Sequence, residues 1–247
     1  MRKPAFTLQS SETATDYWIF VEEEKTSPRP PSYAGAVLFM DGDDMFAAAA
    51  AAYRKQRAAN AVPPLLIVGV GYGGGFGKPA NKRGRDYTPV AHHYEPASGG
   101  ADAFLRFLTT TLWPELDRRY SLAGATRGVA GHSLGSLLVL HALFQPKPFF
   151  SHFLASAPSV WWADRAILTQ ADKLQAQQAG LPARLFLCIG EQDSESSLDD
   201  LRVLEQQLAA KPFRGLEVSV QRIPDRNHYN VLPEAFAAGL GALFGPG

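Results

Sequence analysis

One serine in the chain has the neighbours that a catalytic nucleophile needs. Ser133 lies in the pentapeptide GHSLG over residues 131–135, which matches the pattern G-x-S-x-G. An apolar run that predicts a strand precedes it, and a helical pattern follows it. A sharp turn from strand to helix strains such a serine and exposes its hydroxyl, and the flanking glycines avoid clashes of Cβ atoms. This setting favours a nucleophile over the alternative, a serine in an ordinary turn.

A serine hydroxyl is a weak nucleophile until a base takes its proton. His228 fits that role, because it follows the last predicted strand and a Pro-Asp turn and precedes the last predicted helix. Three other histidines fit less well: His132 is the variable residue of the pentapeptide, His141 lies on the following helix, and His152 begins a strand. We therefore expect His228 to be the base.

A carboxylate is expected to orient the histidine and to stabilise its protonated form. With this type of nucleophile turn, the acid lies between the serine and the histidine in sequence. Asp193 follows the predicted strand over 185–189 and is our choice. The same segment offers competing carboxylates, which could simply cap the helix that follows: Glu191, Glu195 and Asp199.

The tetrahedral intermediate of acyl chemistry needs two hydrogen-bond donors for its oxyanion. One expected donor is the N–H of Leu134, directly after the nucleophile. The other should come from the loop after the predicted strand over 34–40, where the N–H of Asp43 is our choice. The alternative is a turn in which Asp43 and Asp44 cap the next helix, and the two roles are compatible.

Two further motifs suggest other chemistry less well. The pattern G-x-G-x-x-G over 69–74 follows a strand, but Gly75, Gly77 and Pro79 prevent a helix from starting there, so nucleotide binding is not expected. The adjacent His92 and His93 lack the further ligand spacing of a metal site. We therefore expect neither a metal nor an organic cofactor.

The residues that follow are locally basic. The segment over 78–86 carries four cations against one acid, Asp86: Lys78, Lys82, Arg83 and Arg85. Such a cluster could recognise an anionic substrate, or it could be a solvated loop. Both readings remain open from the residues alone.

Elements that could position these residues alternate along the chain. Short apolar runs predict strands over 17–22, 34–40, 65–70, 127–130, 152–156, 185–189 and 216–223. Helical patterns lie over 45–60, 101–120, 134–144, 165–178, 197–210 and 233–244. Prolines at 28, 30 and 31 predict a loop rather than a domain boundary. The alternation predicts one α/β domain over 1–247, with a mostly parallel sheet flanked by helices.

Composition narrows the class of protein. The chain is 46% hydrophobic and 19% charged, which suits a globular core. Its 24 basic and 24 acidic residues cancel, so no global charge favours nucleic acid or a membrane surface. Cys188, the single cysteine, is expected to be buried and inert. The chain has no long apolar run and no signal-like start, which predicts a cytoplasmic protein, or a periplasmic one if a leader has been removed.

Several segments together resemble a known family. They are FMDG over 39–42, RDYTP over 85–89, GHSLG, APSVWW over 157–162, and His228 with Tyr229. The chain, from about Tyr33 to the last helix, resembles the esterase branch of the α/β-hydrolase superfamily. That branch includes siderophore esterases of the enterobactin and salmochelin type and is similar to S-formylglutathione hydrolases and mycolyltransferases.

The resemblance implies roles for particular residues. It supports Asp43 as an oxyanion donor, and it implies that Arg85, Trp161 and Trp162 lie near the substrate. The alternative for the two tryptophans is a packed wall at the start of a helix. Two positions depart from the family pattern: Ser136 stands where many relatives have a second glycine, and Ala157 stands where many have serine.

These expectations combine into a serine carboxylesterase that acts on a small-molecule ester through an acyl-enzyme, with a siderophore lactone as one candidate substrate. Two alternatives remain at this stage. An alcohol could replace water as the acyl acceptor, which would make the protein an acyltransferase. A non-catalytic binding protein could also keep the same fold, although such proteins usually lose the serine or the histidine. The sequence leaves the natural substrate and the oligomeric state open.

Overall fold

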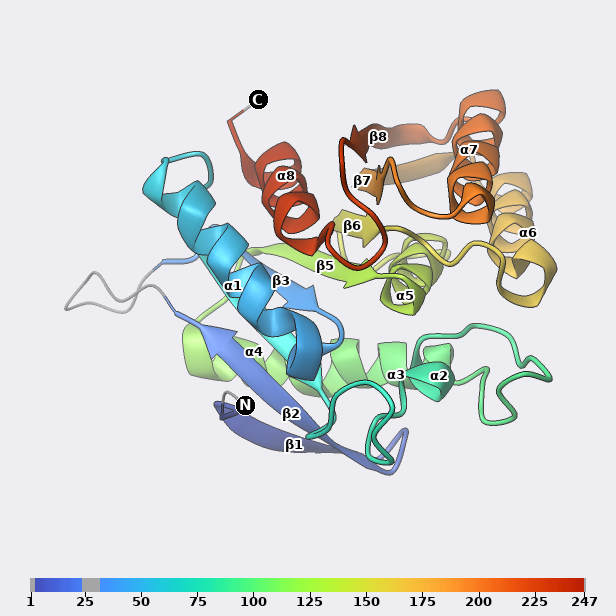
Figure 1. Ribbon diagram of the computed structural model, residues 1–247. Helices are drawn as coiled ribbons and strands as arrows, with labels where there is room; N and C mark the ends of the chain where they lie inside the picture. The colour runs from blue at the N-terminus through green and yellow to red at the C-terminus, as the bar shows by residue number, and fades with distance from the viewer. Residues whose placement is uncertain (1–2, 24–31, 247) are drawn as a thin grey trace.

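A computed structural model describes residues 3–23 and 32–246 of the chain. One sheet of eight strands runs through these residues in the order β1-β2-β4-β3-β5-β6-β7-β8 (Figure 1). The strands are β1 Phe6–Ser10, β2 Thr15–Glu22, β3 Gly35–Phe39, β4 Leu65–Gly71, β5 Thr126–His132, β6 His152–Ser156, β7 Gly180–Gly190 and β8 Arg214–Ile223. The loop predicted at the prolines 28, 30 and 31 lies outside the described residues.

The pairing of the strands is mostly parallel. β1 pairs with β2 and β2 with β4 in antiparallel register, whereas every pair from β4 through β3, β5, β6 and β7 to β8 is parallel. β3 and β4 are buried along their whole length. Strands covered on both faces need apolar side chains throughout, which is why these two runs do not alternate with polar residues.

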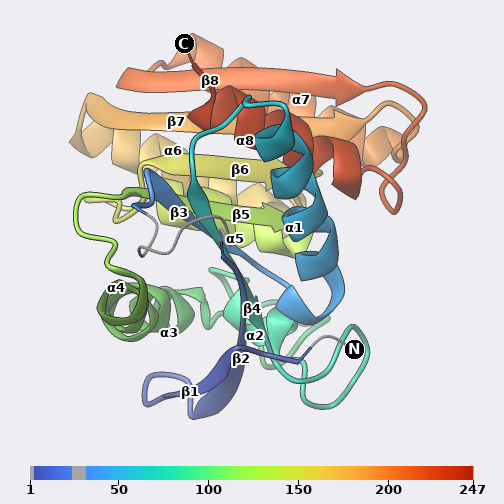
Figure 2. The same ribbon diagram turned by 90° about the vertical axis from the view of Figure 1, so that its left-hand side faces the viewer.

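Helices cover both faces of the sheet (Figures 1 and 2). α1 Gly42–Ala58 and α8 Leu232–Phe244 pack side by side on one face, where Phe46 and Phe236 belong to the same apolar core. The other helices are α2 Arg83–Asp86, α3 Ala101–Arg106, the π-helix η1 Phe107–Leu112, α4 Trp113–Tyr120, α5 Leu134–Leu143, α6 Trp162–Gln177 and α7 Glu195–Ala210. Apolar residues of η1, α5, α6 and α7 form a second core against the opposite face of the sheet. No helix among the described residues is both long and apolar enough to cross a membrane.

The predicted α/β class with a mostly parallel sheet is confirmed, and the differences are local. β1 was not predicted, because it is a short edge strand in which two of the five residues are exposed. The helix predicted over 101–120 is interrupted by the π-helix η1. Pro114 follows η1 and has no N–H to continue regular helical hydrogen bonding, which favours a change of register there.

The topology brings six loops to one edge of the sheet. The strands β3, β4, β5, β6, β7 and β8 run parallel, so their carboxyl ends lie at the same edge. Loops at the carboxyl ends of parallel strands are where ligands bind in open α/β sheets. Ser133 follows β5, Asp193 follows β7 and His228 follows β8, so the fold collects residues that are up to 95 positions apart (228 − 133).

Candidate active site

Ser133 sits in a sharp turn between β5 and α5. Its φ of 57° and ψ of −122° are unfavourable for a residue with a side chain. A Cβ atom on Gly131 would overlap the backbone of Gly135, so a glycine is required where the strand and the helix approach. The N–H of Ser133 donates to the carbonyl of Ser156 at the end of β6 (3.0 Å), which fixes the turn to the sheet. The predicted strand-turn-helix setting of Ser133 is therefore present.

His228 and Asp193 form a hydrogen-bonded pair beside this turn. The Nδ1 atom of His228 lies 2.9 Å from Oδ2 of Asp193. Burial alone would raise the pKa of Asp193, but the hydrogen bonds from His228 and from the N–H of Ser194 outweigh it and lower that pKa. Asp193 is thus a carboxylate at neutral pH and accepts the Nδ1 proton. A neutral ring held in this way leaves Nε2 as its acceptor.

Backbone contacts hold the loops that carry this pair. The N–H of Gln192 donates to the carbonyl of Arg226 (2.8 Å), which joins the loop after β7 to the loop after β8. A Cβ atom on Gly190 would overlap that same carbonyl, so the close approach requires glycine. Next to His228, the side chain of Asn227 accepts from the N–H groups of Tyr229 and Asn230. The histidine therefore stands on a turn with fixed hydrogen bonds.

The competing carboxylates do not hold His228. Glu191 is exposed, and Glu195 is the first residue of α7. Asp199 pairs with Arg202 on the surface of α7 (3.0 Å). The cap of α7 is Ser194, whose hydroxyl accepts from the N–H of Ser197, so the helix does not use Asp193 as its cap. Among the predicted acids, Asp193 is the one beside the histidine.

Ser133 and His228 line two hollows that meet at the serine. The larger hollow, of about 690 Å³, is bordered by polar side chains, including Ser159, Ser196 and Gln192, and by Leu134, Asp193 and Trp161. The smaller hollow, of about 350 Å³, has a more apolar border that includes Met45, Phe76, Leu232 and Tyr229. An ester that reached Ser133 would therefore meet a polar side and an apolar side.

The hydroxyl of Ser133 has a hydrogen-bond partner other than the histidine. Its Oγ lies 3.4 Å from Oγ of Ser159, in the loop after β6. The N–H of Ser159 also donates to the carbonyl of Ser133 (3.3 Å). Catalytic hydrogen bonds are often loose in enzymes without substrate and tighten when substrate binds. Ser159 was not singled out from the sequence, and the segment APSVWW gave the signal that could have found it.

His132 supports the ring of His228 from the buried side. Their ring centroids are 4.6 Å apart, and Nδ1 of His132 lies 3.1 Å from the hydroxyl of Ser156. Burial lowers the pKa of His132 to about 3, and the neighbouring His228 and Arg83 add to the shift. The ring of His132 is therefore neutral across the physiological range. It packs under His228 and adds no charge there.

The two predicted oxyanion donors lie at the starts of helices. Leu134 is the first residue of α5 and Asp43 is the second residue of α1, so neither N–H has a partner within its helix. Leu134 lines the larger hollow. Asp43 does not line either hollow with its side chain, which instead accepts from the N–H of Tyr72. Its backbone N–H remains the candidate donor.

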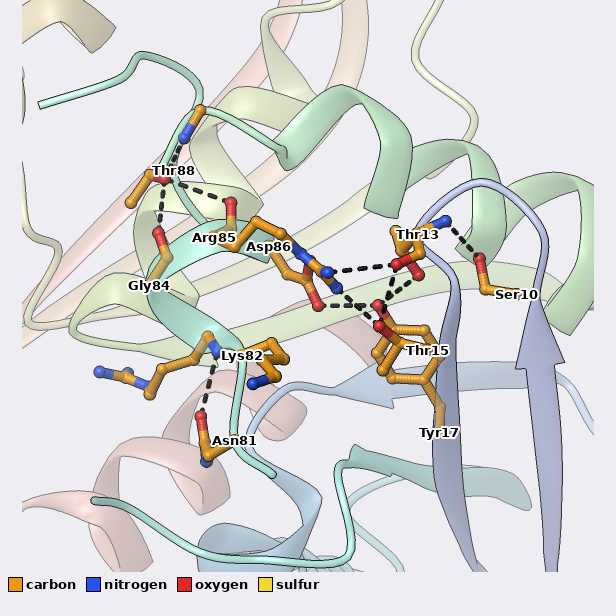
Figure 3. Close-up of polar contacts among 12 residues, drawn as sticks. Ser10, Thr13, Thr15, Tyr17, Asn81, Lys82, Gly84, Arg85, Asp86 and Thr88 are labelled. Atoms are coloured by element: carbon orange, nitrogen blue, oxygen red, sulfur yellow. Dashed lines mark hydrogen bonds and ion pairs between the residues drawn. The ribbon is translucent and has the colours of Figure 1, made fainter. Parts of the chain in front are cut away.

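Arg85 does not border either hollow, contrary to the expectation from the resemblance. Its guanidinium binds Asp86 (2.7 Å), the carbonyl of Thr13 (3.1 Å) and the hydroxyl of Thr15 (2.8 Å) (Figure 3). Asp86 is fully buried and also accepts from the hydroxyl of Tyr17 (2.7 Å). Arg85 thus ties α2 to the β1–β2 hairpin, because a buried carboxylate requires a cationic partner.

Arg83, two residues earlier in the same basic run, borders both hollows. Its guanidinium makes two hydrogen bonds to the fully buried carboxylate of Asp41, at 2.9 and 3.1 Å. It also lies over the ring of Phe76, 4.8 Å from the ring centre. Nη1 makes neither of these two hydrogen bonds. Sequence spacing could not separate Arg83 from Arg85, because the direction of each side chain depends on the turn of α2.

The two tryptophans have different surroundings. Trp161 lines the larger hollow and is 49% exposed. Trp162 is buried, and its indole N–H donates to the carbonyl of Val90 (2.8 Å). Trp162 is therefore part of the packed wall, which was the alternative for both residues. Only Trp161 reaches the hollow.

Other predicted features lie away from this site. His93 is exposed and His92 is partly exposed, and the described residues contain no group of three or more side chains that could hold a metal ion. Cys188 is buried, as expected, and burial raises the pKa of its thiol to about 12. The glycine-rich segment after β4 is followed by turns rather than by a helix until α2.

Comparisons with known proteins show the family of the chain. A protein family described as "Putative esterase" matches residues 20–228 of the chain. The ferri-bacillibactin esterase BesA of Bacillus subtilis (strain 168) is 30% identical over 243 residues, which cover 91% of this chain and 83% of BesA. The siderophore triacetylfusarinine C esterase of Aspergillus fumigatus is 34% identical over 157 residues, which cover 62% of this chain and 53% of that protein.

Solved structures share the fold. A BES protein from Bacillus cereus superposes with a TM-score of 0.84 at 25% identity, covering 97% of this chain and 93% of the other. The siderophore hydrolase EstB from Aspergillus nidulans superposes with a TM-score of 0.80 at 23% identity, covering 97% and 94%. The family match spans most of the chain, so the resemblance predicted from its motifs is confirmed. The chain belongs to this esterase family of α/β-hydrolases and is an ester-bond hydrolase.

Proposed function

We propose that the protein is a serine carboxylesterase in which Ser133 is the nucleophile, His228 the general base and Asp193 the acid. The observation that carries the proposal is the 2.9 Å hydrogen bond between His228 and Asp193 in the loops beside the strained Ser133 turn. Ser133, His228 and Asp193 border the same hollow. This is the arrangement in which a histidine activates a serine.

The mechanism starts with a rotation of the Ser133 side chain. The Ser133 hydroxyl leaves Ser159 and turns toward Nε2 of His228, which takes the proton as the oxygen attacks the ester carbonyl. Asp193 stabilises the resulting imidazolium, and its lowered pKa keeps it ionised for that purpose. His228 then protonates the leaving alcohol. Water, deprotonated by the same ring, attacks the acyl-enzyme and frees Ser133.

The N–H groups of Leu134 and Asp43 hold the oxyanion in this mechanism. Both are unpaired donors in the first turn of a helix, where the helix dipole also favours negative charge. Removing one such donor from a serine hydrolase typically costs about 10²–10³ in kcat. Because both donors are backbone groups, no side-chain substitution removes them directly.

The substrate is a small-molecule ester of the siderophore class. The relatives support this class, since BesA is named for ferri-bacillibactin and the Aspergillus fumigatus enzyme for triacetylfusarinine C. The larger hollow has hydroxyl and amide side chains for a substrate rich in polar groups. Arg83 replaces Arg85 as the residue that recognises substrate oxygens, because its guanidinium borders both hollows. Trp161 offers an aromatic wall.

Labelling with a fluorophosphonate probe tests the nucleophile. We expect the wild-type protein to bind one probe at Ser133, and Ser133→Ala to bind none and to lose hydrolysis of aryl esters. Ser159→Ala is the matched control, because it changes the neighbouring serine and leaves the nucleophile in place. Labelling that persists in Ser133→Ala, or that is absent from the folded wild type, would contradict the proposal and revive a non-catalytic binding protein.

A substrate series tests the class of ester. We would compare trilactone siderophores with aryl esters of increasing chain length, and we expect the lactones to have the higher kcat/KM. A preference for short aryl esters would rule out the siderophore proposal while leaving the serine mechanism intact. Adding small alcohols and measuring the partition between free acid and transferred ester distinguishes hydrolysis from acyl transfer.

A further inference from the structure

Three consecutive residues after the tryptophan pair have a left-handed backbone. Ala163, Asp164 and Arg165 have φ angles of 48°, 54° and 62° and ψ angles of 56°, 43° and 38°. Residues other than glycine adopt this conformation singly, not in runs, because Cβ lies too close to the following carbonyl. A run of three persists only where surrounding contacts determine it. The contacts at both ends of this turn are therefore the candidates for what determines its conformation.

The turn is anchored at each end. At its start, the buried Trp162 donates its indole N–H to the carbonyl of Val90 (2.8 Å). At its end, Nε and Nη2 of Arg165 both lie 2.8 Å from Oδ1 of Asp200, on α7. The side chain of Asp200 is 4% exposed, so this carboxylate needs a cationic partner and Arg165 supplies it.

Trp161 is the part of this segment that borders the proposed substrate site. It borders the larger hollow and also an adjoining hollow of about 500 Å³, which is lined in addition by Asp164, Arg165 and Asp200. Trp161 therefore stands between the ion pair and the proposed substrate site. Its carbonyl accepts from the N–H of Arg165 (3.4 Å), so the backbone that carries the indole closes directly onto the anchored residue.

The other partner of the ion pair belongs to the helix next to the acid. α7 begins at Glu195, directly after its cap Ser194 and two residues after Asp193. Ser196, in the first turn of α7, borders the same two hollows as Trp161. The contact between Arg165 and Asp200 thus joins the segment that carries Trp161 to the helix that follows the Asp193 loop.

We propose that Arg165 and Asp200 are positioning residues for the substrate. Their ion pair holds the left-handed turn and so keeps the Trp161 indole at the wall of the hollow, where it packs against an apolar or aromatic face of a large ester. The inference rests on the proposed function, because it assigns this wall to substrate binding. Neither residue touches the reacting atoms, so their effect depends on the size of the substrate.

The central test uses Asp200→Asn and Arg165→Gln. We expect each to raise KM for a bulky aryl or lactone ester by about 10-fold, the scale of a small misplacement of a positioning group. KM and kcat for an aryl acetate should change less than about twofold, since acetate does not reach Trp161. The matched control is Asp172→Asn, which removes an exposed ion pair to Lys211 between α6 and the end of α7. It should leave KM and kcat unchanged for both esters.

A second variant separates positioning from a general structural role. Asp164→Gly supplies a residue that adopts the left-handed conformation readily, so it should restore the low KM for bulky esters when combined with Asp200→Asn. Iodide quenching of Trp161, taken as the difference from a Trp161→Phe counterpart, should rise in Asp200→Asn and return in the double variant. This readout needs no catalysis.

The outcomes distinguish the two proposals. Equal increases in KM for the acetate and the bulky ester, an unchanged quenching of Trp161, or a failure of Asp164→Gly to restore either property would overturn the positioning role. Fluorophosphonate labelling of Ser133 should proceed at the wild-type rate in every variant. If the wild type itself fails to label, the proposed function fails, while the quenching experiment still decides whether the ion pair holds Trp161.

Discussion

The described part of the chain contains two histidine–aspartate pairs that lie in different layers of the fold. His228 and Asp193 meet in the loops at the carboxyl edge of the sheet, with Nδ1 2.9 Å from the carboxylate. His141 on α5 and Asp102 on α3 meet in the helical layer, with Nε2 2.8 Å from the carboxylate. By distance alone the two pairs are equivalent.

The second ring nitrogen separates them. In His141 the Nδ1 atom faces Oε1 of Gln170 at 2.9 Å, and the amide of Gln170 is oriented by its own donation to the carbonyls of His141 and Phe144. Neither nitrogen of His141 is left to take a proton from a nucleophile. For Nε2 of His228, no hydrogen-bond partner is found among residues 3–23 and 32–246, and His228 borders the hollow that contains Ser133.

Exposure is also reversed between the pairs. In the pair beside Ser133, the carboxylate is 3% exposed and the histidine 29%. In the helical layer, the histidine is 7% exposed and the carboxylate 69%. An accessible histidine with a buried carboxylate behind it can exchange a proton with a substrate. A buried histidine whose carboxylate is exposed is better suited to linking helices. The presence of a histidine–aspartate pair is therefore a weaker sign of catalysis than which of its two side chains is exposed.

The largest difference should appear when each histidine is replaced. We expect His228→Gln to lower kcat by about 10⁴-fold, because the serine loses its base. His141→Gln should keep kcat within about twofold and lower the melting temperature instead, since it removes a buried residue whose ring bonds side chains on two other helices, α3 and α6. Steady-state kinetics and thermal unfolding of both variants check this. A comparable loss of kcat in the two variants would remove the distinction.

Replacing the acids should give a smaller contrast. Asp193→Asn keeps the shape but no longer stabilises the imidazolium, and we expect kcat to fall by about 10³-fold or more. Asp102→Asn changes a mostly exposed carboxylate and should leave kcat unchanged. The ratio of kcat values at neutral pH measures the effect. Activity retained in Asp193→Asn would return the role of acid to Glu191 or Glu195.

Acid should destabilise the region around His228 more than the helical layer. Burial lowers the pKa of His132 to about 3, so below about pH 6.5 the unfolded chain binds a proton at this residue that the folded chain does not. The free energy of unfolding should therefore decrease as the pH is lowered from about 6.5 to 3. This group contributes a slope of up to about 1.4 kcal/mol per pH unit. Denaturant unfolding of His132→Phe should show a shallower slope than wild type.

Asp193 adds to the same trend at lower pH. Its pKa is lowered in the folded state, so its stabilising contribution is complete above its unfolded value near 4 and is lost as the pH falls through the folded value. Asp102→Asn serves as the control for His132→Phe, because the exposed carboxylate of Asp102 is screened by solvent. An unchanged slope in His132→Phe would show that the folded protein protonates this ring.

The smallest effect should come from Gln170. Gln170→Leu removes the acceptor at Nδ1 of His141 and two donations to backbone carbonyls. We expect a loss of about 1–3 kcal/mol in the free energy of unfolding, because buried groups lose their partners. KM and kcat should stay at the wild-type values. A change in kcat would mean that the helical layer is coupled to the site after all.

The local features of the site could be read from the sequence because they depend on near neighbours. The glycines around Ser133 follow from the close approach of a strand and a helix, and the order of Ser133, Asp193 and His228 along the chain follows from the order of the strands. The same logic gave the parallel sheet and the loop of Asp193. Edge strand β1 and the π-helix η1 escaped prediction, since one depends on pairing with β2 and the other on helical register.

What only the tertiary structure decided is the direction of side chains and their partners. Arg83 and Arg85 are two positions apart and chemically identical, yet the first borders the hollows and the second binds the β1–β2 hairpin. Likewise, the sequence by itself determined that Trp161 and Trp162 are adjacent, and the packing around Val90 decided which one is buried. Sequence patterns report local geometry, whereas these assignments depend on contacts between residues that are about 70 positions apart in the chain and meet only in the folded protein.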